Sequence, residues 1–300
     1  MIASRFSLSR RQALNALGAA GTASLLAACG SGSTFEPLVP TRFVSFGDGW
    51  SDLGQTAGGN RFTVNDGSTN VWVAQLAARY GKTISAQAAG GLGYAQGGAR
   101  IDTAANSMAD QITAFLADNS IGSSDVLVLD AGISELLALA GSLTGSALNT
   151  AADLAGKALA TQARRLTAAG CKRLVLSNTM DAGKTPFATA ASRTTELSSA
   201  TRAFNDALKI ALADVSSSML LIDTEAYVNL VHTSPTSYLG SSGVATGSAC
   251  PSGTFNTTTC TTANANTNYN SFLFADDRHP TPAMHRLIGD NAYSRVKARW

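Results

Sequence analysis

The chain has 300 residues, of which 45% are hydrophobic and only 14% are charged. This length suits one large domain or two small ones, and the apolar content supports a sizeable buried core while excluding the disordered class. The 22 basic and 20 acidic residues give a formal net charge of +2. Because this small charge is spread along the chain, it gives no reason to expect nucleic acid or acidic partners.

The N-terminal segment has the pattern of an export signal that ends at Cys29. Arg10 and Arg11 precede an apolar run over residues 13–28, which is too short for a comfortable membrane span. Paired arginines before such a run are typical of a twin-arginine signal. The run ends in LAACG, which resembles a bacterial lipobox and predicts a lipidated Cys29 at the mature N-terminus. An ordinary signal peptide with an incidental cysteine is the alternative.

After a short tether over residues 30–40, apolar strands alternate with helices. The predicted strands are residues 42–46, 83–87, 125–132, 172–178 and 219–224. The predicted helices are residues 70–81, 106–118, 150–169, 195–215 and a C-terminal helix after Pro282. This alternation indicates a parallel sheet covered on both faces. We therefore expect one α/β domain over residues 41–300, with five strands and a ligand site at their carboxyl ends.

A polar stretch over residues 233–270 is too long for a plain connection. It is predicted to be a lid, a substrate-binding loop or a disulfide-pinned insertion. Cys250 and Cys260 lie inside it, and an exported protein meets oxidising conditions, so we expect a disulfide between them; two free thiols are the alternative. Cys171 is expected to be a small buried residue. The three histidines and the cysteines show no zinc-like spacing, so no metal site is predicted.

Four short blocks collect the residues suited to chemistry. They are GDGWSD at 47–52, the glycine pair at 97–98, GISE at 132–135 and DDRH at 276–279. In these blocks and their order, the chain resembles the SGNH, or GDSL, hydrolase family, especially its exported bacterial esterase and phospholipase-like members. The resemblance covers nearly the whole mature chain. It implies a flavodoxin-like α/β/α sandwich and ester hydrolysis through a Ser–His–Asp arrangement, and no motif implies a cofactor.

The clearest match is the segment LFADDRHPTPAMHRL. Asp276 precedes His279 by three residues, and a proline follows, as in the DxxHP motif of the family. A carboxylate in this place can orient the imidazole and leave its other nitrogen free as a general base. The resemblance thus implies an Asp276–His279 dyad; an aspartate capping the helix near Pro282 is the alternative. His285 and His232 are expected to be structural.

Two blocks resemble the oxyanion-binding segments of the family. GYAQGGARI places Gly98 where the family supplies a backbone N–H, and glycine lets the backbone approach a ligand closely. In the other block the family has Gly-x-Asn-Asp, and Ser134 stands at the Asn position. The loss of one oxyanion donor typically costs roughly 2.7–4 kcal/mol, of which a hydroxyl could recover a part. An equal alternative is that Ser134 caps the following helix, with Glu135 in its first turn.

The first block departs most from the family. Where the family reads Gly-Asp-Ser-x-Ser-Asp, with the first Ser as nucleophile, this chain places Gly49, which offers only its backbone N–H to an oxyanion. Deletion of a triad nucleophile costs on the order of a millionfold in turnover. Two replacements are considered: Ser51, in a shifted turn that Gly49 would permit, and a water molecule activated by Asp276 and His279. In a helical turn Ser51 would face away from the site. Trp50 is expected to line the pocket or to pack over the strand end.

Two functional hypotheses follow. One is an ester hydrolase of the cell envelope, esterase- or lipase-like, that uses the base dyad with Ser51 or water. The other is a catalytically inactive relative that binds an acyl or carbohydrate ester group. Replacement of two signature residues favours the second, whereas the retained dyad and Gly98 favour the first. The expected partners are a small-molecule or lipid ester and, through Cys29, a bacterial membrane on its periplasmic or outer-membrane side; the sequence predicts no oligomeric state.

Overall fold

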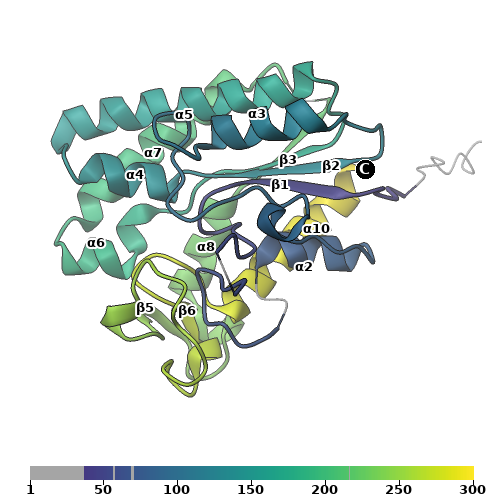
Figure 1. The fold of residues 1–300 in the computed structure, drawn as a ribbon. Coiled ribbons are helices and arrows are strands. Elements are labelled where there is room, and N and C mark those ends of the chain that lie inside the picture. The colour runs from purple at the N-terminus through teal and green to yellow at the C-terminus, as the bar shows by residue number, and fades with distance from the viewer. Residues whose placement is uncertain (1–36, 57, 69–70, 216) are drawn as a thin grey trace, which may run out of the picture. The chain divides into compact units, whose positions relative to one another are not determined.

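Four parallel strands form the centre of the fold in the computed structural model (Figure 1). In their order across the sheet they are β1 (Phe43–Gly47), β2 (Val126–Asp130), β3 (Leu174–Ser177) and β4 (Met219–Ile222). Every residue of the first three strands is buried, as expected for parallel strands covered on both faces. The register pairs Gly47 with Asp130, and Asp130 with Ser177. Polar and glycine residues therefore gather at the carboxyl edge of the sheet.

The structure describes residues 37–300, with gaps at 57, 69–70 and 216. All described helices and strands belong to one unit, Leu38–Arg299. The predicted export signal, its lipobox Cys29 and most of the tether lie outside the described residues. Among the described helices, none combines the length and the apolar character needed to cross a membrane.

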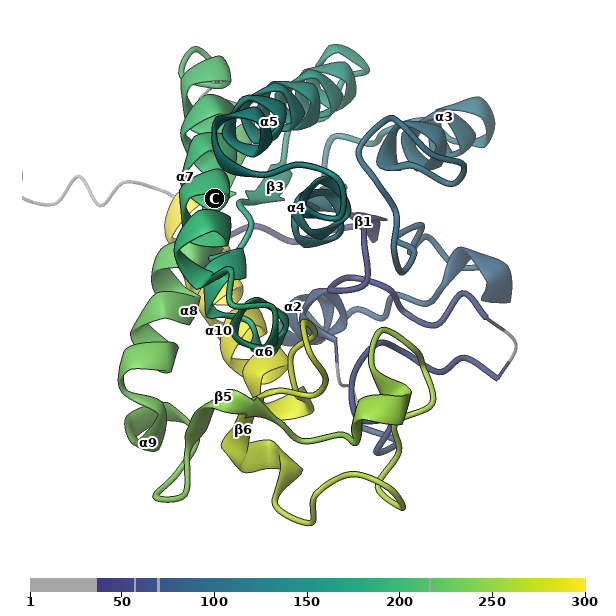
Figure 2. The same cartoon turned by 90° about the vertical axis from the view of Figure 1, so that its left-hand side faces the viewer.

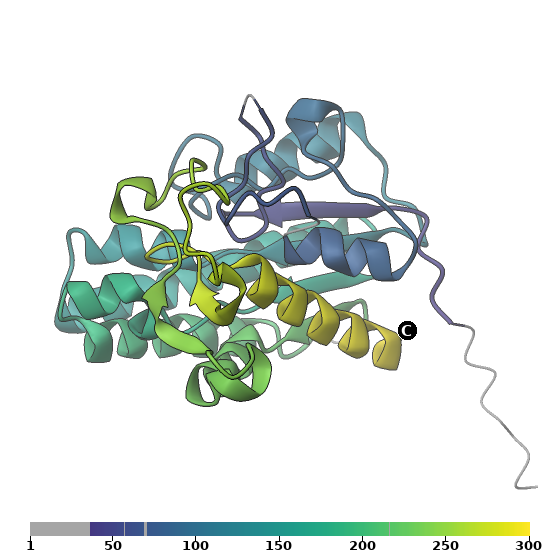
Figure 3. The ribbon, with the colours of Figure 1, turned by 90° about the horizontal axis from the view of Figure 1, so that it is seen from below.

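Helices cover both faces of the sheet (Figure 1, Figure 2). One layer contains α3 (Met108–Asp118), α4 (Ile133–Ala140), α5 (Gly145–Ala168) and α7 (Thr194–Ala211). The other contains α2 (Trp72–Arg79), α8 (Thr224–Thr233) and α10 (Pro282–Arg299), and α10 lies along α2 (Figure 3). Short helices α6 (Pro186–Ala190) and α9 (Pro235–Tyr238) complete the set. The predicted α/β/α sandwich with a parallel sheet is thus confirmed.

The predicted strand over residues 83–87 is wrong, because this segment does not join the sheet. Gln87–Ala89 forms a 3₁₀ turn (η1), and Gly90 closes it with a φ of +79°. The edge of β1 is instead bonded by the chain after this turn: Ser45 N–H donates to the Leu92 carbonyl at 3.1 Å, and Tyr94 N–H donates to the Ser45 carbonyl at 2.7 Å. Glycines favour such tight turns and weaken a regular strand, and three of them follow residues 83–87 closely, at positions 90, 91 and 93.

The polar stretch over residues 233–270 is an insertion pinned by the predicted disulfide, Cys250–Cys260. Its strand β5 (Val244–Ser248) pairs in parallel with β6 (Phe272–Phe274), a second sheet that the sequence analysis did not predict. Short 3₁₀ turns η3 (Ser252–Thr254) and η4 (Tyr269–Ser271) connect the rest. The two cysteines pack with Val64 and Ala275 in a small core of their own. The disulfide therefore closes a loop within the insertion, and apolar contacts with Val64 and Ala275 attach this loop to the rest of the domain.

Helices α5 and α7 pack closely because α5 has a glycine at their contact. A Cβ atom on Gly156 would lie only 2.2 Å from the Phe204 carbonyl oxygen of α7. Since backbone atoms cannot turn aside as a flexible side chain can, a larger residue here must push the helices apart. Close backbone contact thus outweighs the poor helix propensity of glycine at this position.

We predict that Gly156→Ala lowers the free energy of unfolding by about 1–3 kcal/mol, because the added methyl group overpacks the contact between α5 and α7. Urea denaturation followed by circular dichroism measures the change. Gly253→Ala is the matched control, since a Cβ atom there meets no atom within 4 Å. A Gly156→Ala midpoint equal to or above that of the unmodified protein would contradict the prediction.

Candidate active site

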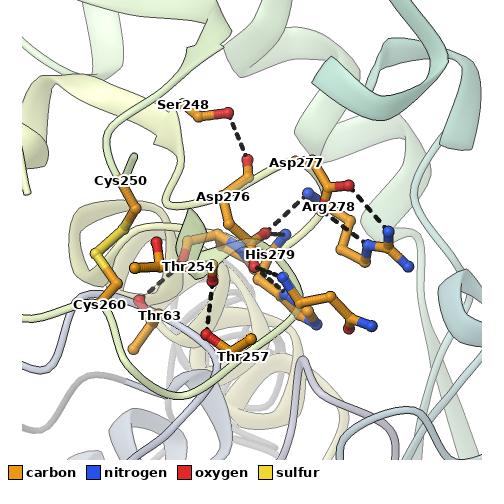
Figure 4. Close-up of polar contacts among 12 residues, drawn as sticks. Thr63, Ser248, Cys250, Thr254, Thr257, Cys260, Asp276, Asp277, Arg278 and His279 are labelled. Atoms are coloured by element: carbon orange, nitrogen blue, oxygen red, sulfur yellow. Dashed lines mark hydrogen bonds and ion pairs between the residues drawn. A yellow bond between two sulfur atoms is a disulfide. The ribbon is translucent and has the colours of Figure 1, made fainter. Parts of the chain in front are cut away.

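Asp276 and His279 form a buried hydrogen-bonded pair (Figure 4). His279 Nδ1 lies 2.8 Å from Asp276 Oδ2, which also accepts the Asn256 N–H at 2.9 Å. Asp276 Oδ1 accepts the N–H groups of Arg278 at 2.9 Å and His279 at 2.7 Å. Burial raises the pKa of this carboxyl, but the charge of His279 and these hydrogen bonds outweigh it and lower the pKa below its ordinary value. The carboxylate is therefore ionised and fixed in place.

The loop that carries this pair runs from β6 to α10 and is held by three other segments. Trp50 Nε1 donates to the Arg278 carbonyl at 3.0 Å. Thr63 Oγ1 donates to the Pro280 carbonyl at 2.8 Å, and Ser248 Oγ of β5 donates to the Asp276 carbonyl at 2.9 Å (Figure 4). The imidazole orientation thus depends on the first block, on the segment after it and on the insertion. Trp50 is buried and serves this packing role.

The second imidazole nitrogen faces the glycine of the first block. His279 is fully buried, and its Nε2 has no hydrogen-bond partner among the described residues. A Cβ atom on Gly49 would lie 2.5 Å from this nitrogen. Gly49 does not belong to the glycines with positive φ, so the turn conformation itself does not demand glycine there. Gly49, the residue at the predicted nucleophile position, therefore lies directly beside the Nε2 atom of His279 but has no side chain to offer it.

The structure does not bring Ser51 to the dyad. Its fully buried hydroxyl donates to Asp130 Oδ2 at 2.8 Å and accepts the Trp72 Nε1–H at 2.9 Å. Trp72 Nε1 also lies 3.0 Å from Asp130 Oδ2, which closes a three-residue network. The turn after β1, in which Ser51 N–H donates to the Asp48 carbonyl at 3.1 Å, directs this side chain back toward the sheet. The shifted turn that would make Ser51 a nucleophile is absent from this arrangement.

Two buried carboxyl groups support that turn. Asp48 Oδ1 accepts the Trp50 N–H at 3.2 Å, and Asp48 Oδ2 accepts the Ser134 N–H at 3.1 Å. Burial raises the pKa of Asp48. Burial and then the charge of Asp48 raise the pKa of Asp130 to about 7. At least one of these two neighbours therefore binds a proton well above the pH at which free aspartate releases it.

The predicted oxyanion residues occupy different surroundings. Gly98 has a φ of +74°, and a Cβ atom there would meet nothing within 4 Å. Asp52 fixes the adjoining turn by accepting the Gly97 N–H at 2.8 Å.

Ser134 bonds to Asp48 through both its N–H and its side chain. Ser134 does not cap α4, because Gly132 occupies the N-cap position, whereas Glu135 does lie in the first turn.

Glu135 links α4 to the segment that carries the glycine pair. It forms an ion pair with Arg100, and its Oε2 accepts the Ile101 N–H at 3.1 Å. The third block thus stabilises the second block through a buried carboxylate. This contact fixes the backbone that follows Gly98.

Phe62 packs against the imidazole of His279, and the sequence analysis did not identify it. Its ring centroid lies 4.9 Å from that of His279. A Cβ atom on Gly97 would lie 1.9 Å from Phe62 Cε2, so the ring occupies space that only a glycine leaves free. The neighbouring Asn65 fastens this segment to the disulfide loop, where its N–H donates to the Cys260 carbonyl at 2.9 Å. Gly97 was the sequence feature that pointed to a close neighbour at this place, but no sequence pattern identified that neighbour as Phe62.

The other histidines lie outside this pair. His285 is fully buried, and its Nδ1 accepts the Trp72 N–H at 3.3 Å. Burial lowers its pKa to about 3, so its ring stays neutral and structural at ordinary pH. His232 is half-buried in α8. Over the described residues, no group of three or more His, Cys, Asp or Glu side chains is placed to hold a metal ion.

We predict that Phe62→Ala exposes His279 Nε2 and raises its rate of modification by diethyl pyrocarbonate severalfold, because the ring that shields the nitrogen is removed. Peptide mass spectrometry separates His279 from His232, whose rate should not change and serves as the internal control. An unchanged His279 rate in a folded variant would show that Phe62 does not shield the base.

A second prediction concerns Asp130→Asn and pH. Because the pKa of Asp130 is raised from 3.8 to about 7 in the folded protein, its stabilising contribution is complete below about pH 4 and is lost as the pH rises toward 7. The unfolding free energy of the unmodified protein, minus that of Asp130→Asn, should therefore fall between pH 4 and pH 7. Urea denaturation at several pH values measures this difference, and a constant or rising difference would contradict the assignment.

Comparison with known proteins agrees with this architecture. One solved structure, a member of the lipolytic protein G-D-S-L family from Veillonella parvula DSM 2008, aligns with a TM-score of 0.50 and 13% identity, over 84% of this chain and 96% of its own. Another aligns with a TM-score of 0.48 and 17% identity, over 88% of this chain and 99% of its own. The sequence matches no curated protein. The family model for GDSL-like lipase/acylhydrolase matches residues 43–292, and the chain therefore belongs to that family.

Proposed function

We propose that the protein is an ester hydrolase of the cell envelope in which His279 activates a water molecule in place of a serine hydroxyl. The observation that carries this proposal is the buried Asp276–His279 pair with its Nε2 directed at Gly49. A buried polar atom without a partner typically costs about 1–3 kcal/mol, and a catalytic role is one of the reasons for which a protein retains one. Membership in the lipase/acylhydrolase family supports an ester as substrate.

The proposed reaction has no acyl-enzyme intermediate. Nε2 of His279 accepts a proton from water while the water oxygen bonds to the ester carbonyl carbon. The backbone N–H groups of Gly49 and Gly98 are the proposed donors to the resulting oxyanion. Collapse of this tetrahedral species breaks the bond to the alkoxide, which takes the proton back from His279. Acid and alcohol leave, and Asp276 stabilises the imidazolium throughout.

The access of a substrate requires movement of Phe62. The ring lies against His279, and no solvent reaches Nε2 in this arrangement. An ester that displaces the ring would bring its own apolar part into the same space. This requirement favours esters with an apolar acyl chain or an aromatic group over small polar esters.

A specific observation also favours the alternative, an inactive relative that binds an acyl or carbohydrate ester group. Gly49 has no side chain, and the hydroxyl of Ser51 is engaged with Asp130 and Trp72. Under this alternative the dyad serves to shape the site. The anchoring at Cys29 belongs to both proposals and is supported by the sequence pattern of the signal.

We predict that the protein hydrolyses nitrophenyl acetate and butyrate above the buffer rate, and that His279→Ala abolishes this activity because the general base is lost. Ser51→Ala should retain it, since water supplies the attacking oxygen. Gly49→Ser should raise the rate and make the protein reactive with a fluorophosphonate probe, provided that His279 shifts to accommodate the added side chain. Circular dichroism confirms the folding of each variant.

The outcomes separate the two functions. Activity that Ser51→Ala removes from a folded protein would contradict the water mechanism. If the unmodified protein and His279→Ala both stay at the buffer rate while Gly49→Ser is active, the site is intact but the natural protein is a binding relative. If the unmodified protein stays at the buffer rate and Gly49→Ser is also inactive and unlabelled, the proposed hydrolysis of these esters is contradicted.

A further inference from the structure

A cleft of about 580 Å³ is lined by residues of α6, α7, α8 and β5 and of the segment before α6, and by neither residue of the dyad. The backbone of these elements can be followed in Figure 2. Its lining residues are Gly183, Lys184, Thr189, Thr194, Thr195, Ser198, Ser199, Arg202, His232 and Thr246. This volume lies within the range of about 300–1,000 Å³ that is usual for small-molecule sites. None of these residues belongs to the four blocks of the candidate active site.

Basic groups converge on this cleft. Lys184, Arg202 and His232 all line it. Neither Lys184 nor Arg202 forms an ion pair with a carboxylate of the described residues. Asp181 is the acidic neighbour, but its Oδ1 accepts the Gly183 N–H at 2.9 Å and the Ser198 hydroxyl at 2.7 Å. Two cations thus border the cleft without a protein anion bonded to them.

The second feature of the cleft is a row of hydroxyl groups on one face of α7. Thr195 lies three and four residues before Ser198 and Ser199, and Arg202 lies four and three residues after them, so these side chains share one face of the helix. Ser199 accepts the Asn149 side-chain N–H at 3.0 Å, so its own hydrogen is free to donate toward a ligand. Thr246 of β5 adds a hydroxyl from the opposite wall.

We propose that this cleft binds a small hydroxylated molecule that carries an oxyanion, either a carboxylate or a phosphate. Arg202 supplies a planar fork and Lys184 a compact point charge, and both suit an oxyanion. The hydroxyl groups of α7 and β5 can exchange hydrogen bonds with those of the ligand. Apart from the methylene stems of Lys184 and Arg202, the side chains that line the cleft are polar, which distinguishes it from an acyl site.

The walls of the cleft also contact the loop of the dyad. In α6, Phe187 N–H donates to the Asp277 carbonyl at 3.0 Å, and its ring lies 5.2 Å from the Arg278 guanidinium carbon. In β5, Ser248 bonds to the Asp276 carbonyl. The cleft is therefore a separate site built on the same framework as the candidate active site.

Calorimetric titration of the full protein at low ionic strength tests the proposal, with glucuronate, glucose 6-phosphate, inorganic phosphate and glucose as probes. We expect saturable binding of at least one sugar anion, weaker binding of inorganic phosphate and none of glucose. In Lys184→Gln/Arg202→Gln the affinity should fall by about tenfold or more, because charge-assisted hydrogen bonds are lost. Lys172→Gln/Lys297→Gln removes the same charge away from the cleft and should bind as the unmodified protein does.

The absence of saturable binding for both sugar anions would overturn the proposal, as would equal affinity in Lys184→Gln/Arg202→Gln and the control variant. If inorganic phosphate binds as tightly as the sugar anions, the hydroxyl groups do not contribute and the proposed ligand class is wrong. Unfolding midpoints of both double variants show that a loss of affinity is not a loss of fold. The assay contains no ester, so its result is independent of whether the dyad hydrolyses one.

Discussion

The buried carboxylate of Asp276 is the constraint on which the rest of the site depends. An ionised group can be kept away from water only when hydrogen bonds replace its hydration. Here the donors come from its own loop, from His279 and from Asn256 of the disulfide-pinned insertion. The second sheet, the Cys250–Cys260 disulfide and the start of α10 are thus parts of one support. Their common effect is to fix an imidazole with its free nitrogen directed at the turn after β1.

In that turn the residue beside the imidazole of His279 is a glycine, and the nearest serine of the first block points elsewhere. The backbone of the turn lies against His279 at Gly49, where an added Cβ atom would be 2.5 Å from Nε2. The nearby Ser51 has a structural role, because its hydroxyl bonds both to Asp130, at the end of β2, and to Trp72 of α2. The network of Ser51 therefore helps to attach the first block to the sheet. Of the two serines in the family pattern, this chain has only the second, Ser51, and its hydroxyl bonds to Asp130 and Trp72.

Much of this arrangement is predictable from local sequence, and the rest depends on contacts between distant segments. Apolar strands alternating with helices predicted the parallel sheet, and the resemblance to the DxxHP motif implied the contact of Asp276 and His279; the catalytic role of that contact stays a proposal. Loop composition and export context predicted the disulfide. The strand expected at 83–87 failed because glycines after it turn the chain back. The position of Ser51 and the cover by Phe62 were not predictable, since their partners Trp72, Asp130 and Gly97 come from other segments and no periodicity encodes such packing.

Several contacts around His279 join residues that are far apart in the sequence, and this separation affects the order in which contacts form during folding. Trp50 and Arg278 are separated by 228 positions, Thr63 and Pro280 by 217, and Asn65 and Cys260 by 195. Closing loops of this length costs chain entropy before any contact repays it, and such contacts form slowly. The strands β1 to β4 pair over much shorter distances. Contact order alone thus allows the strands of the sheet to pair before the distant segments that surround His279 are joined.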